Sequence, residues 1–447
     1  MQIVLPEDVQ YIIKALESAG FEGFAVGGCV RDSIMGRTPH DWDITTNARP
    51  ETVKKLFNHT IDTGIEHGTV TVMLHKTGYE VTTYRIDGKY TDGRHPDSVS
   101  FASNLSDDLS RRDFTVNAMA YNESKGLVDL FGGMEDLEKK IIRCVGVPRE
   151  RFGEDALRML RALRFSATLG FEVEKDTYDA IKELSDTLEK VSAERIYTEL
   201  IKLLTSDEPQ KIRDCYRTGL TKVFMPEYDA IVGVPQNNPH HCYDVEEHTL
   251  KVLENTPPDK VIRLAALFHD MGKPVCHTVD ERGIDHFHGH QAVSEELSKK
   301  ILKRLKSDND TISKVCRFVL YHDVRTEAER RQVRRLINRI GAENIEGLLA
   351  LQTADTMAQS DYMRADKLRR IEELRSIAED IKRSGEAVNL KGLAVDGNDL
   401  KALGYKPGRT LGAALKKLLD DVLEDPSLNT REYLLGEAER LKTQGEQ

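Results

Sequence analysis

The stretch Gly27-Gly28-Cys29-Val30-Arg31-Asp32, followed by Asp41-Trp42-Asp43, decides the fold of the first part of the chain. The apolar run 23–26 predicts a strand, and residues 30–35 predict the helix after it. Gly27 and Gly28 have no Cβ, so the backbone between strand and helix can approach a phosphate group closely. Asp41 and Asp43 are two residues apart, so on a strand both carboxylates point to the same face.

Two carboxylates on one face can share divalent cations. Beside a turn that cradles phosphate, such a metal site fits nucleotidyl transfer, because the metals neutralise a triphosphate and activate an attacking hydroxyl. A pair of solvated surface aspartates is the alternative interpretation of Asp-x-Asp. The glycine turn nearby favours the functional interpretation.

Length and composition limit the kind of protein. The chain has 447 residues, of which 31% are charged and 39% hydrophobic, so about two to four domains of a soluble, helix-rich protein are expected. No stretch approaches the roughly 20 apolar residues of a membrane span. The six cysteines show no CxxC pairing, which favours a reduced, cytoplasmic location. The net charge of −11 argues only mildly against a nucleic-acid partner, because binding depends on where basic residues cluster.

Residues 1–145 mix helix and strand signals, whereas the pattern from residue 146 onward is almost wholly helical. The β-branched runs 69–74 and 80–85 predict a hairpin with a turn at Lys76-Thr77-Gly78. Helical periodicity covers these longer segments: 154–169, 175–184, 194–204, 292–305 and 368–383. Changes in composition suggest domain boundaries near 145, 236 and 366.

Two short motifs suggest how a nucleotide could be held. Arg111 and Arg112 can grip phosphates bidentately, while the adjacent Asp113 can accept hydrogen bonds from ribose hydroxyls. A surface salt bridge is the alternative for this triplet. Asp155 and Arg158 are expected at the start of a helix, three residues apart and on one face.

A carboxylate beside a guanidinium complements the Watson–Crick edges of cytosine and adenine. Both bases present an amino donor next to a ring-nitrogen acceptor, and uracil and guanine present the reverse polarity. Asp155 and Arg158 are therefore candidates for base selection, with a surface ion pair on the helix as the alternative. Arg161 and Arg164 extend the basic stripe, so nucleotide or backbone phosphate could also lie along this helix.

Histidines supply the third signal, because nine of the 14 fall between His240 and His322. Imidazoles and carboxylates that converge from several helices suit a transition metal that activates water against a phosphoester. The metal could be Mn, Ni, Co or Fe, and the candidate ligands are His248, His269, Asp270, His290, His322 and Asp355. No role is assigned to the histidines of Pro239-His240-His241 and His286-Phe287-His288.

The ordered motifs resemble the bacterial class II tRNA nucleotidyltransferases, which are the CCA-adding enzymes and close relatives of bacterial poly(A) polymerases. The likeness rests on Gly27-Gly28-x-Val30-Arg31-Asp32, Asp41-Trp42-Asp43, Arg111–Ala118 and Glu154-Asp155-x-x-Arg158. The histidine pattern resembles an HD phosphohydrolase domain. The tail from Asp396 to Gly408 is similar to the tRNA-contacting C-terminal region of the family.

The resemblance implies an α+β protein, with a mixed α/β nucleotidyltransferase head followed by mostly helical parts. These would be a head over 1–145, a neck and body over 146–235, an HD domain over 236–365 and a tRNA-contacting tail over 366–447. The partners would be tRNA, CTP and ATP, with no membrane. The cofactors would be Mg²⁺ in the head and a divalent transition metal such as Ni²⁺ or Mn²⁺ in the HD domain.

Roles for single residues also follow from the resemblance. Asp41 and Asp43 would be the Mg²⁺ ligands, with Glu80 as a third catalytic carboxylate. Asp155 and Arg158 would select CTP and then ATP. The triphosphate and ribose would be bound by Gly27, Gly28, Arg31, Arg111, Arg112 and Asp113.

Several functions remain open. Residues 85–96 resemble the loop that lets the site switch from C to A, which favours full CCA addition over addition of CC only. Addition of the final A only is an alternative, and poly(A) synthesis is disfavoured because no Arg-Arg-Phe signature follows the body start. Two rivals belong to other classes: an HD nucleotide or phosphodiester hydrolase with a regulatory head, and a non-catalytic RNA-binding protein.

Overall fold

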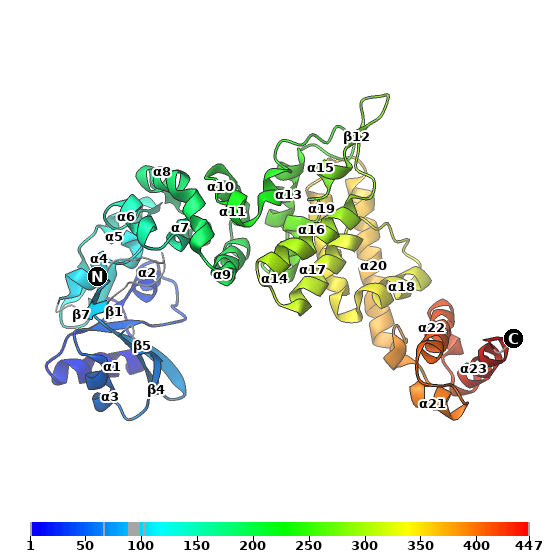
Figure 1. The fold of residues 1–447 in the computed structure, drawn as a ribbon, viewed down its shortest axis with the longest axis horizontal. Coiled ribbons are helices and arrows are strands. Elements are labelled where there is room, and N and C mark those ends of the chain that lie inside the picture. Colours follow the sequence, from blue (N-terminus) through cyan, green and yellow to red (C-terminus); the bar gives the residue numbers. More distant parts are fainter. Residues whose placement is uncertain (1, 66–67, 88–98, 102–103, 446–447) are drawn as a thin grey trace. The chain divides into compact units, whose positions relative to one another are not determined.

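The computed structural model describes residues 2–65, 68–87, 99–101 and 104–445. The chain divides into two compact units, Met1–Asp229 and Ala230–Gln447, which are coloured from blue to green and from green to red in Figure 1. The predicted boundaries near 145 and 366 subdivide these units and stay predictions.

A seven-stranded mixed sheet forms the base of the first unit, in the order β3-β4-β5-β2-β1-β8-β9. Its strands are β1 (Gly23–Val26), β2 (Ile44–Thr46), β3 (Thr60–Gly64), β4 (Thr69–Leu74), β5 (Thr77–Thr83), β8 (Met119–Asn122) and β9 (Gly126–Asp129). The neighbours β2 and β5 run parallel, with Ile44 beside Val81 and Thr45 beside Thr82. The other neighbouring strands of the sheet run antiparallel.

Both faces of this sheet are covered by helices. The apolar stripe of α1 (Glu7–Ser18) is buried as its spacing predicts, and α1 packs against β1 and β2 beside α3 (Pro50–Leu56), as seen in Figure 1. Leu105 and Leu109 of α4 (Leu105–Ser110) join a buried cluster with Phe24, Val26, Tyr84 and Ala120. The helix α2 (Gly28–Ile34) follows β1 directly, as the sequence predicts.

Outside the sheet, the first unit consists mainly of helices, with two short strand pairs. Their bounds are α5 Gly133–Lys139, α6 Pro148–Glu154, α7 Leu157–Leu169, α8 Lys175–Leu184, α9 Ala193–Leu204, α10 Ile212–Arg217, α11 Thr221–Phe224 and α12 Pro226–Asp229. Three short strand pairs lie outside the main sheet: β6 (Arg85–Asp87) with β7 (Val99–Phe101), β10 (Ile141–Ile142) with β11 (Glu172–Val173), and, in the second unit, β12 (Thr278–Val279) with β13 (Asp285–His286). The helix α7 packs against α9, which brings the arginines of α7 beside Glu199 of α9.

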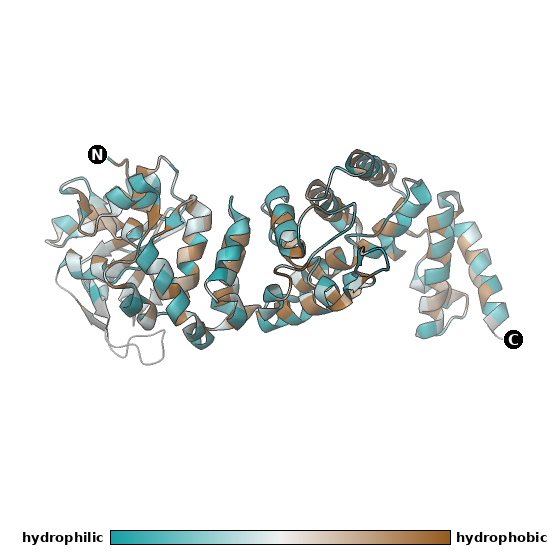
Figure 2. Ribbon diagram, turned by 90° about the horizontal axis from the view of Figure 1, so that it is seen from above, coloured by the Kyte–Doolittle hydropathy of each residue, from teal (hydrophilic) through white to brown (hydrophobic). Residues whose placement is uncertain are grey.

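The second unit is helical apart from β12 and β13. Its helices are α13 Val245–Asn255, α14 Lys260–Phe268, α15 Lys273–Cys276, α16 His290–Arg304, α17 Asn309–Tyr321, α18 Arg330–Ile340, α19 Ile345–Met357, α20 Arg364–Ser384, α21 Gly397–Ala402, α22 Arg409–Glu424 and α23 Arg431–Gly445. Figure 2 shows hydrophobic and hydrophilic residues interleaved along these helices, as expected where each buries one side. The last three helices share a core that includes Leu400, Leu418 and Leu434.

The structure corrects two local predictions. The hairpin turn lies at His75 and Lys76, both with positive φ, and not at 76–78, because β5 already begins at Thr77. The helix predicted over 154–169 is interrupted, since α6 ends at Glu154 and α7 begins at Leu157. Asp155 between them is extended, with φ −144° and ψ 103°. Most of the segment 85–96, interpreted as a C-to-A switching loop, lies outside the described residues.

Among the described residues, no helix has both the length and the apolar character needed to cross a membrane. All six cysteines are free thiols. The cytoplasmic location stays a prediction.

Candidate functional site

The carboxylates of Asp41, Asp43 and Glu80 gather at one end of the β2–β5 pair. The parallel register sets Ile44 beside Val81, so the residues before them, Asp43 and Glu80, are neighbours on the opposite face. Burial raises the pKa of Asp43; the nearby Arg112 lowers it, and the charges of Glu80 and Asp41 raise it further. Among the described residues, however, these three carboxylates do not form a group of three in which all the ligand oxygens lie within 4.8 Å of one another. The histidine cluster described below contains two such groups. The three carboxylates concentrate negative charge here, and a bound cation would reduce the repulsion between them.

Gly27 forms the turn between β1 and α2. Its φ of +85° lies in the region that favours glycine, and a Cβ built there would stand 2.8 Å from Nη1 of Arg112. The guanidinium of Arg112 therefore lies directly over the glycine turn, and its charge also reaches Asp43. The glycine turn at Gly27, the guanidinium of Arg112 and the carboxylate of Asp43 thus lie close to one another.

Asp108, which the sequence interpretation missed, holds both arginines of the Arg-Arg-Asp motif. The carboxylate is fully buried and accepts hydrogen bonds from Arg111 at 2.6 and 3.0 Å and from Arg112 at 3.4 Å. It also accepts a hydrogen bond from Thr45 on β2 at 3.1 Å. Burial raises the pKa of Asp108, but the two guanidinium groups outweigh it, so the pKa lies below its usual range. The signal in the sequence was the spacing of three and four residues from this carboxylate to the two arginines.

Asp113 forms an ion pair with Arg161 of α7. Arg161 donates two hydrogen bonds to its Oδ2, at 2.6 and 2.9 Å, and Asn117 donates to Oδ1 at 3.3 Å. Burial of Asp113 raises its pKa, but the charge of Arg161 outweighs this effect and the pKa is lowered to about 2. Arg31 also contacts this group, because it donates to Asn117 at 2.6 Å. A ribose contact by Asp113 stays a prediction, and its carboxylate is shared with Arg161.

Arg161 and Arg164 were predicted to follow nucleotide or backbone phosphate. In the structure Glu199 of α9 lies between them, 3.6 Å from Arg161 and 2.7 Å from Arg164. Arg164 is only 8% exposed, and its guanidinium stacks 3.4 Å from the centre of the Phe165 ring. The geometry gives Arg164 an internal ion pair, so its phosphate contact stays a prediction without structural support.

Asp155 and Arg158, the predicted base readers, lie at the break between α6 and α7. Asp155 Oδ1 accepts a hydrogen bond from the backbone N–H of Leu157 at 3.1 Å, and Oδ2 lies 2.6 Å from Nη2 of Arg195 on α9. Arg158 donates to Glu154 at 2.6 Å and to the carbonyl of Arg111 at 3.1 Å. Both side chains are therefore held by partners within the protein, and Arg195 is a contact of Asp155 that the sequence interpretation missed.

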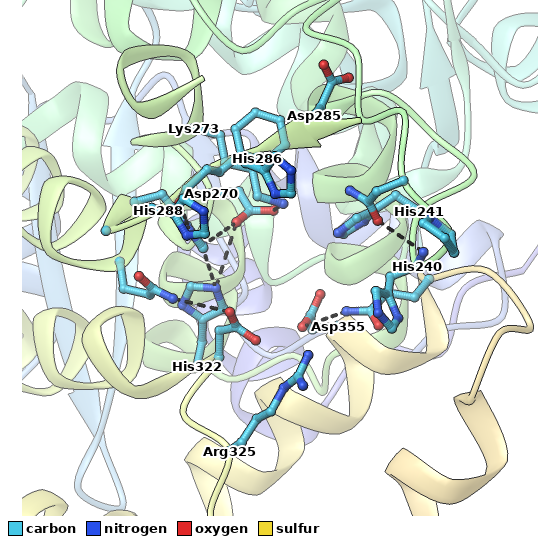
Figure 3. A pocket seen from close by; sticks show the side chains of 18 of the residues that line it. His240, His241, Asp270, Lys273, Asp285, His286, His288, His322, Arg325 and Asp355 are labelled. Atoms are coloured by element: carbon cyan, nitrogen blue, oxygen red, sulfur yellow. Dashed lines mark hydrogen bonds and ion pairs between the residues drawn. The ribbon is translucent and has the colours of Figure 1, made fainter. Parts of the chain in front are cut away.

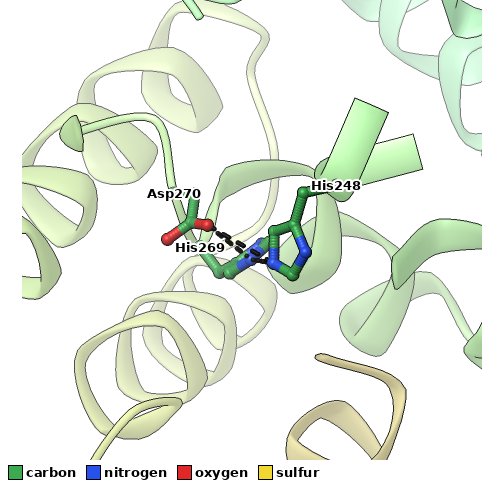
Figure 4. A group of neighbouring side chains, drawn as sticks. All are labelled: His248, His269 and Asp270. Carbon is green, nitrogen blue, oxygen red and sulfur yellow. Dashed lines mark hydrogen bonds and ion pairs between the residues drawn. The ribbon is translucent and has the colours of Figure 1, made fainter. Parts of the chain in front are cut away.

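The six predicted metal ligands converge in the second unit from α13, α16, α19 and the ends of α14 and α17. Asp270 is central: Oδ2 lies 3.1 Å from Nε2 of His269 and 3.5 Å from that of His248, as Figure 4 shows. Its Oδ1 lies 3.3 Å from Nε2 of His290 and 3.7 Å from that of His322. Asp355 lies 2.9 Å from Nε2 of His248. Two groups of three possible ligands thus share Asp270.

The outer nitrogens of these histidines are held by backbone carbonyls, so the inner nitrogens can face a metal. Nδ1 lies near a backbone carbonyl in every case, at 3.3 Å for His248, 2.7 Å for His269, 2.9 Å for His290 and 2.6 Å for His322. A proton on Nδ1 leaves a lone pair on Nε2, which is the orientation that metal-bound histidines show. The facing Nε2 atoms of His248 and His269, and those of His290 and His322, are 3.3 Å apart. This donor set fits a divalent transition metal.

A cavity of about 420 Å³ lies against this cluster. Lys273 reaches into it three residues after Asp270 and forms an ion pair with that carboxylate at 2.6 Å. His240, His241, His286 and His288, to which the sequence interpretation assigned no role, also line the cavity, as Figure 3 shows. The histidine pattern alone could not reveal these neighbours, because they lie on β13 and on loops, outside the helices that carry the cluster.

Comparison with known protein families matches three parts of the chain. Residues 23–143 match the poly A polymerase head domain, residues 170–232 match the "Probable RNA and SrmB- binding site of polymerase A", and residues 284–438 match tRNA nucleotidyltransferase domain 2. The chain is 36% identical over 445 residues to the CCA-adding enzyme of Limosilactobacillus reuteri (strain DSM 20016), covering 98% of each protein. It is 53% identical to that of Leuconostoc mesenteroides over 230 residues, which are 50% of this chain and 57% of the relative.

Solved structures agree with these relatives. The Bacillus stearothermophilus CCA-adding enzyme in complex with CTP has a TM-score of 0.75 at 28% identity, covering 99% of this chain and 100% of that one. The Thermotoga maritima CCA-adding enzyme complexed with tRNA has a TM-score of 0.57 at 20% identity, covering 98% and 99%, which shows likeness of fold alone. The α+β nucleotidyltransferase fold and the resemblance to the CCA-adding enzymes predicted from the motifs are confirmed. The resemblance of the histidine pattern to an HD domain stays a prediction.

Proposed function

The chain belongs to the CCA-adding enzymes, a family of tRNA nucleotidyltransferases, and from this premise we propose that it adds C, C and A to the 3′ end of tRNA. The substrates would be CTP, ATP and tRNA. The 3′-hydroxyl of the tRNA would attack the α-phosphorus of the nucleotide, and pyrophosphate would leave. Base choice would need no nucleic-acid template, because the protein itself presents a fixed carboxylate and guanidinium.

The observation that carries this proposal is the meeting of Arg112, Gly27 and Asp43 at one end of the sheet. The backbone turn and Arg112 would hold the triphosphate, with Arg111 and Arg31 alongside. Asp41 and Asp43 would hold Mg²⁺, which would neutralise triphosphate charge and activate the attacking hydroxyl. The negative charge concentrated around Asp43 fits a cation there, and Glu80 is close enough to add to it.

Asp155 and Arg158 would recognise the incoming base. Asp155 would accept from the amino group of cytosine or adenine, and Arg158 would donate to the adjacent ring nitrogen. Their fixed positions support this role, because an ordered pair of opposite polarity rejects uracil and guanine. Addition of A alone is the alternative, and poly(A) synthesis is a weaker one.

Substitution of the metal-binding carboxylate tests the proposal. Asp41→Ala should abolish incorporation of labelled CTP and ATP while tRNA binding, measured by filter retention, stays within about twofold of the parent. Loss of both would indicate misfolding, and full activity in the variant would contradict the assigned carboxylate. The retained binding also separates catalysis from a purely RNA-binding role.

We propose a second activity for the histidine cluster. It would hydrolyse phosphoesters as HD domains do, for example a phosphate at a damaged tRNA end. Four Nε2 atoms converge on Asp270 and would hold a metal such as Ni²⁺ or Mn²⁺, which activates water. His269→Ala should abolish hydrolysis of a chromogenic phosphoester by the metal-loaded protein and leave CTP incorporation intact. Absence of metal-dependent hydrolysis in the parent would refute this second activity.

A further inference from the structure

The cavity beside the histidine cluster has a positively charged side that neither proposed activity has yet used. Figure 3 shows Arg325 reaching into it below His322 and Asp355. Lys367 of α20 lines the same cavity. Both cations also line a smaller adjoining hollow, together with Arg370, so the positive charge continues beyond the cluster.

The partners of these cations are neutral or absent. Lys367 Nζ lies 3.1 Å from Nδ1 of His240 and donates to Oε1 of Gln359 at 2.5 Å. Across residues 2–65, 68–87, 99–101 and 104–445, Arg325 makes no hydrogen bond or ion pair through its side chain. The nearest acidic candidate in sequence, Asp323, instead accepts a hydrogen bond from Gln291 at 3.2 Å.

The third cation of the cavity, Lys273, differs from these two. Lys273 is 4% exposed and its ammonium lies 2.6 Å from Asp270, so it already has an anionic partner inside the protein. Asp355, the remaining carboxylate of the cluster, lies 2.9 Å from His248 and accepts from Gln359. Arg325 and Lys367 thus line the cavity beside the carboxylates of Asp323 and Asp355, and within the described residues neither cation forms an ion pair with them.

Charges of both signs act on Lys367. Burial lowers the pKa of Lys367, and the carboxylates of Asp355 and Asp323 raise it, whereas the charges of Arg325 and Arg370 lower it. Burial, followed by the charges of Lys367 and Arg325, lowers the pKa of His240. This favours the neutral imidazole, whose Nδ1 can accept from Lys367 at 3.1 Å. An anion placed between the two cations would relieve their repulsion.

We propose that Arg325 and Lys367 form a phosphate-binding subsite that makes the pocket specific for phosphomonoesters. The inference rests on the proposed phosphoesterase activity and names its substrate class. A terminal phosphate is close to a dianion at neutral pH, whereas a phosphodiester carries one charge. Two cations opposite the Asp270 cluster match the dianion, and about 420 Å³ accommodates a ligand the size of a nucleoside monophosphate.

Inorganic phosphate is the direct probe. Full-length protein loaded with Mn²⁺ is titrated with phosphate by calorimetry, and metal content is measured separately. Arg325→Gln and Lys367→Gln should each raise the Kd for phosphate roughly tenfold, since each removes a charge-assisted hydrogen bond. Arg325→Lys should restore most of the affinity. Arg282→Gln and Lys300→Gln are matched controls, because each removes one positive charge from a residue that does not line the cavity. They should change neither the Kd for phosphate nor the metal content.

Hydrolysis then tests the substrate class. With p-nitrophenyl phosphate, both glutamine variants should raise KM by a similar factor, and with bis-p-nitrophenyl phosphate the KM should change by less than about twofold. Unchanged phosphate affinity in both variants, or an equal KM effect on the diester, would overturn the subsite. If the parent hydrolyses neither ester but phosphate binding still depends on Arg325 and Lys367, the phosphoesterase proposal fails and the subsite stands.

Discussion

Asp108 is fully buried, yet it touches the two arginines and the strand on which the head site depends. Asp108→Asn removes the charge and keeps the size of the side chain. We expect kcat/KM for CTP to fall about tenfold, as for other groups that orient ligand-binding side chains. Stability should fall by about 1–3 kcal/mol, because buried partners lose a charged hydrogen-bond acceptor.

The neighbouring Asp107 provides a matched control, because its carboxylate is half-buried and accepts a hydrogen bond from Asn104 at 2.9 Å rather than from an arginine of the motif. Asp107→Asn should leave CTP kinetics unchanged. If Asp108→Asn lowered thermal stability and left KM and kcat as in the parent, Asp108 would be structural and would not position the arginines.

Asp113 makes a prediction about pH. Its pKa is lowered to about 2 by Arg161, so its stabilising effect is fully present above the ordinary pKa near 4 and is lost as pH falls through about 2. The Tm difference between the parent and Asp113→Asn should therefore stay constant from about pH 8 to 5 and shrink as the pH drops further. At neutral pH the carboxylate contributes on the order of 2 kcal/mol. A difference that grew on acidification would contradict the Asp113–Arg161 pair.

At the scale of elements, the turn between β1 and α2 combines a special conformation with a close approach. Gly27→Ala forces a side chain into φ +85° and displaces Arg112, so we expect lost CTP incorporation together with about 1–2 kcal/mol of destabilisation. Gly36, at the far end of α2, has φ +72° and open space around it. Gly36→Ala should cost similar stability and retain activity, and equal loss of activity in both would contradict the Arg112 argument.

The break between α6 and α7 predicts a role for α9 in base choice. Arg195 fixes Asp155, so Arg195→Gln should reduce the preference for CTP over UTP about tenfold, measured as the ratio of kcat/KM values. Lys202→Ala on the same helix is the control and should leave the ratio unchanged. A proportional fall in the use of all four nucleotides would instead indicate a general loss of structure.

These elements also show how far the sequence predicts the site. Periodicity located α1, α8 and α9 because each buries an apolar stripe of its own. It ran straight through Asp155, because the residues on both sides keep helical spacing. In the structure Asp155 is extended, accepts from the N–H of Leu157 and contacts Arg195, 40 residues away. Motif spacing placed Gly27 and Asp43 correctly near each other, but the buried anchor Asp108 carries no periodic signal and became visible only through its partners.

At the scale of the whole molecule, each unit carries its own constellation of functional groups. The head groups lie within Met1–Asp229, and the histidine cluster lies within Ala230–Gln447. The sequence predicted the candidate ligands of both sites from residue type and motif spacing, and their roles as metal ligands stay predictions. It did not predict Lys273, Arg325 or Lys367 in the cavity, because exposed lysines and arginines are common and only the fold brings these three together.

The most direct test is incorporation of labelled CTP and ATP into three tRNA substrates, one lacking CCA, one ending in C and one ending in CC. UTP and GTP are the nucleotide controls, and Asp43→Ala is the blank. We predict ordered addition of two C and one A that is absent in the variant. Activity on the CC-ended tRNA alone, or runs of A on any RNA, would contradict CCA addition by this chain.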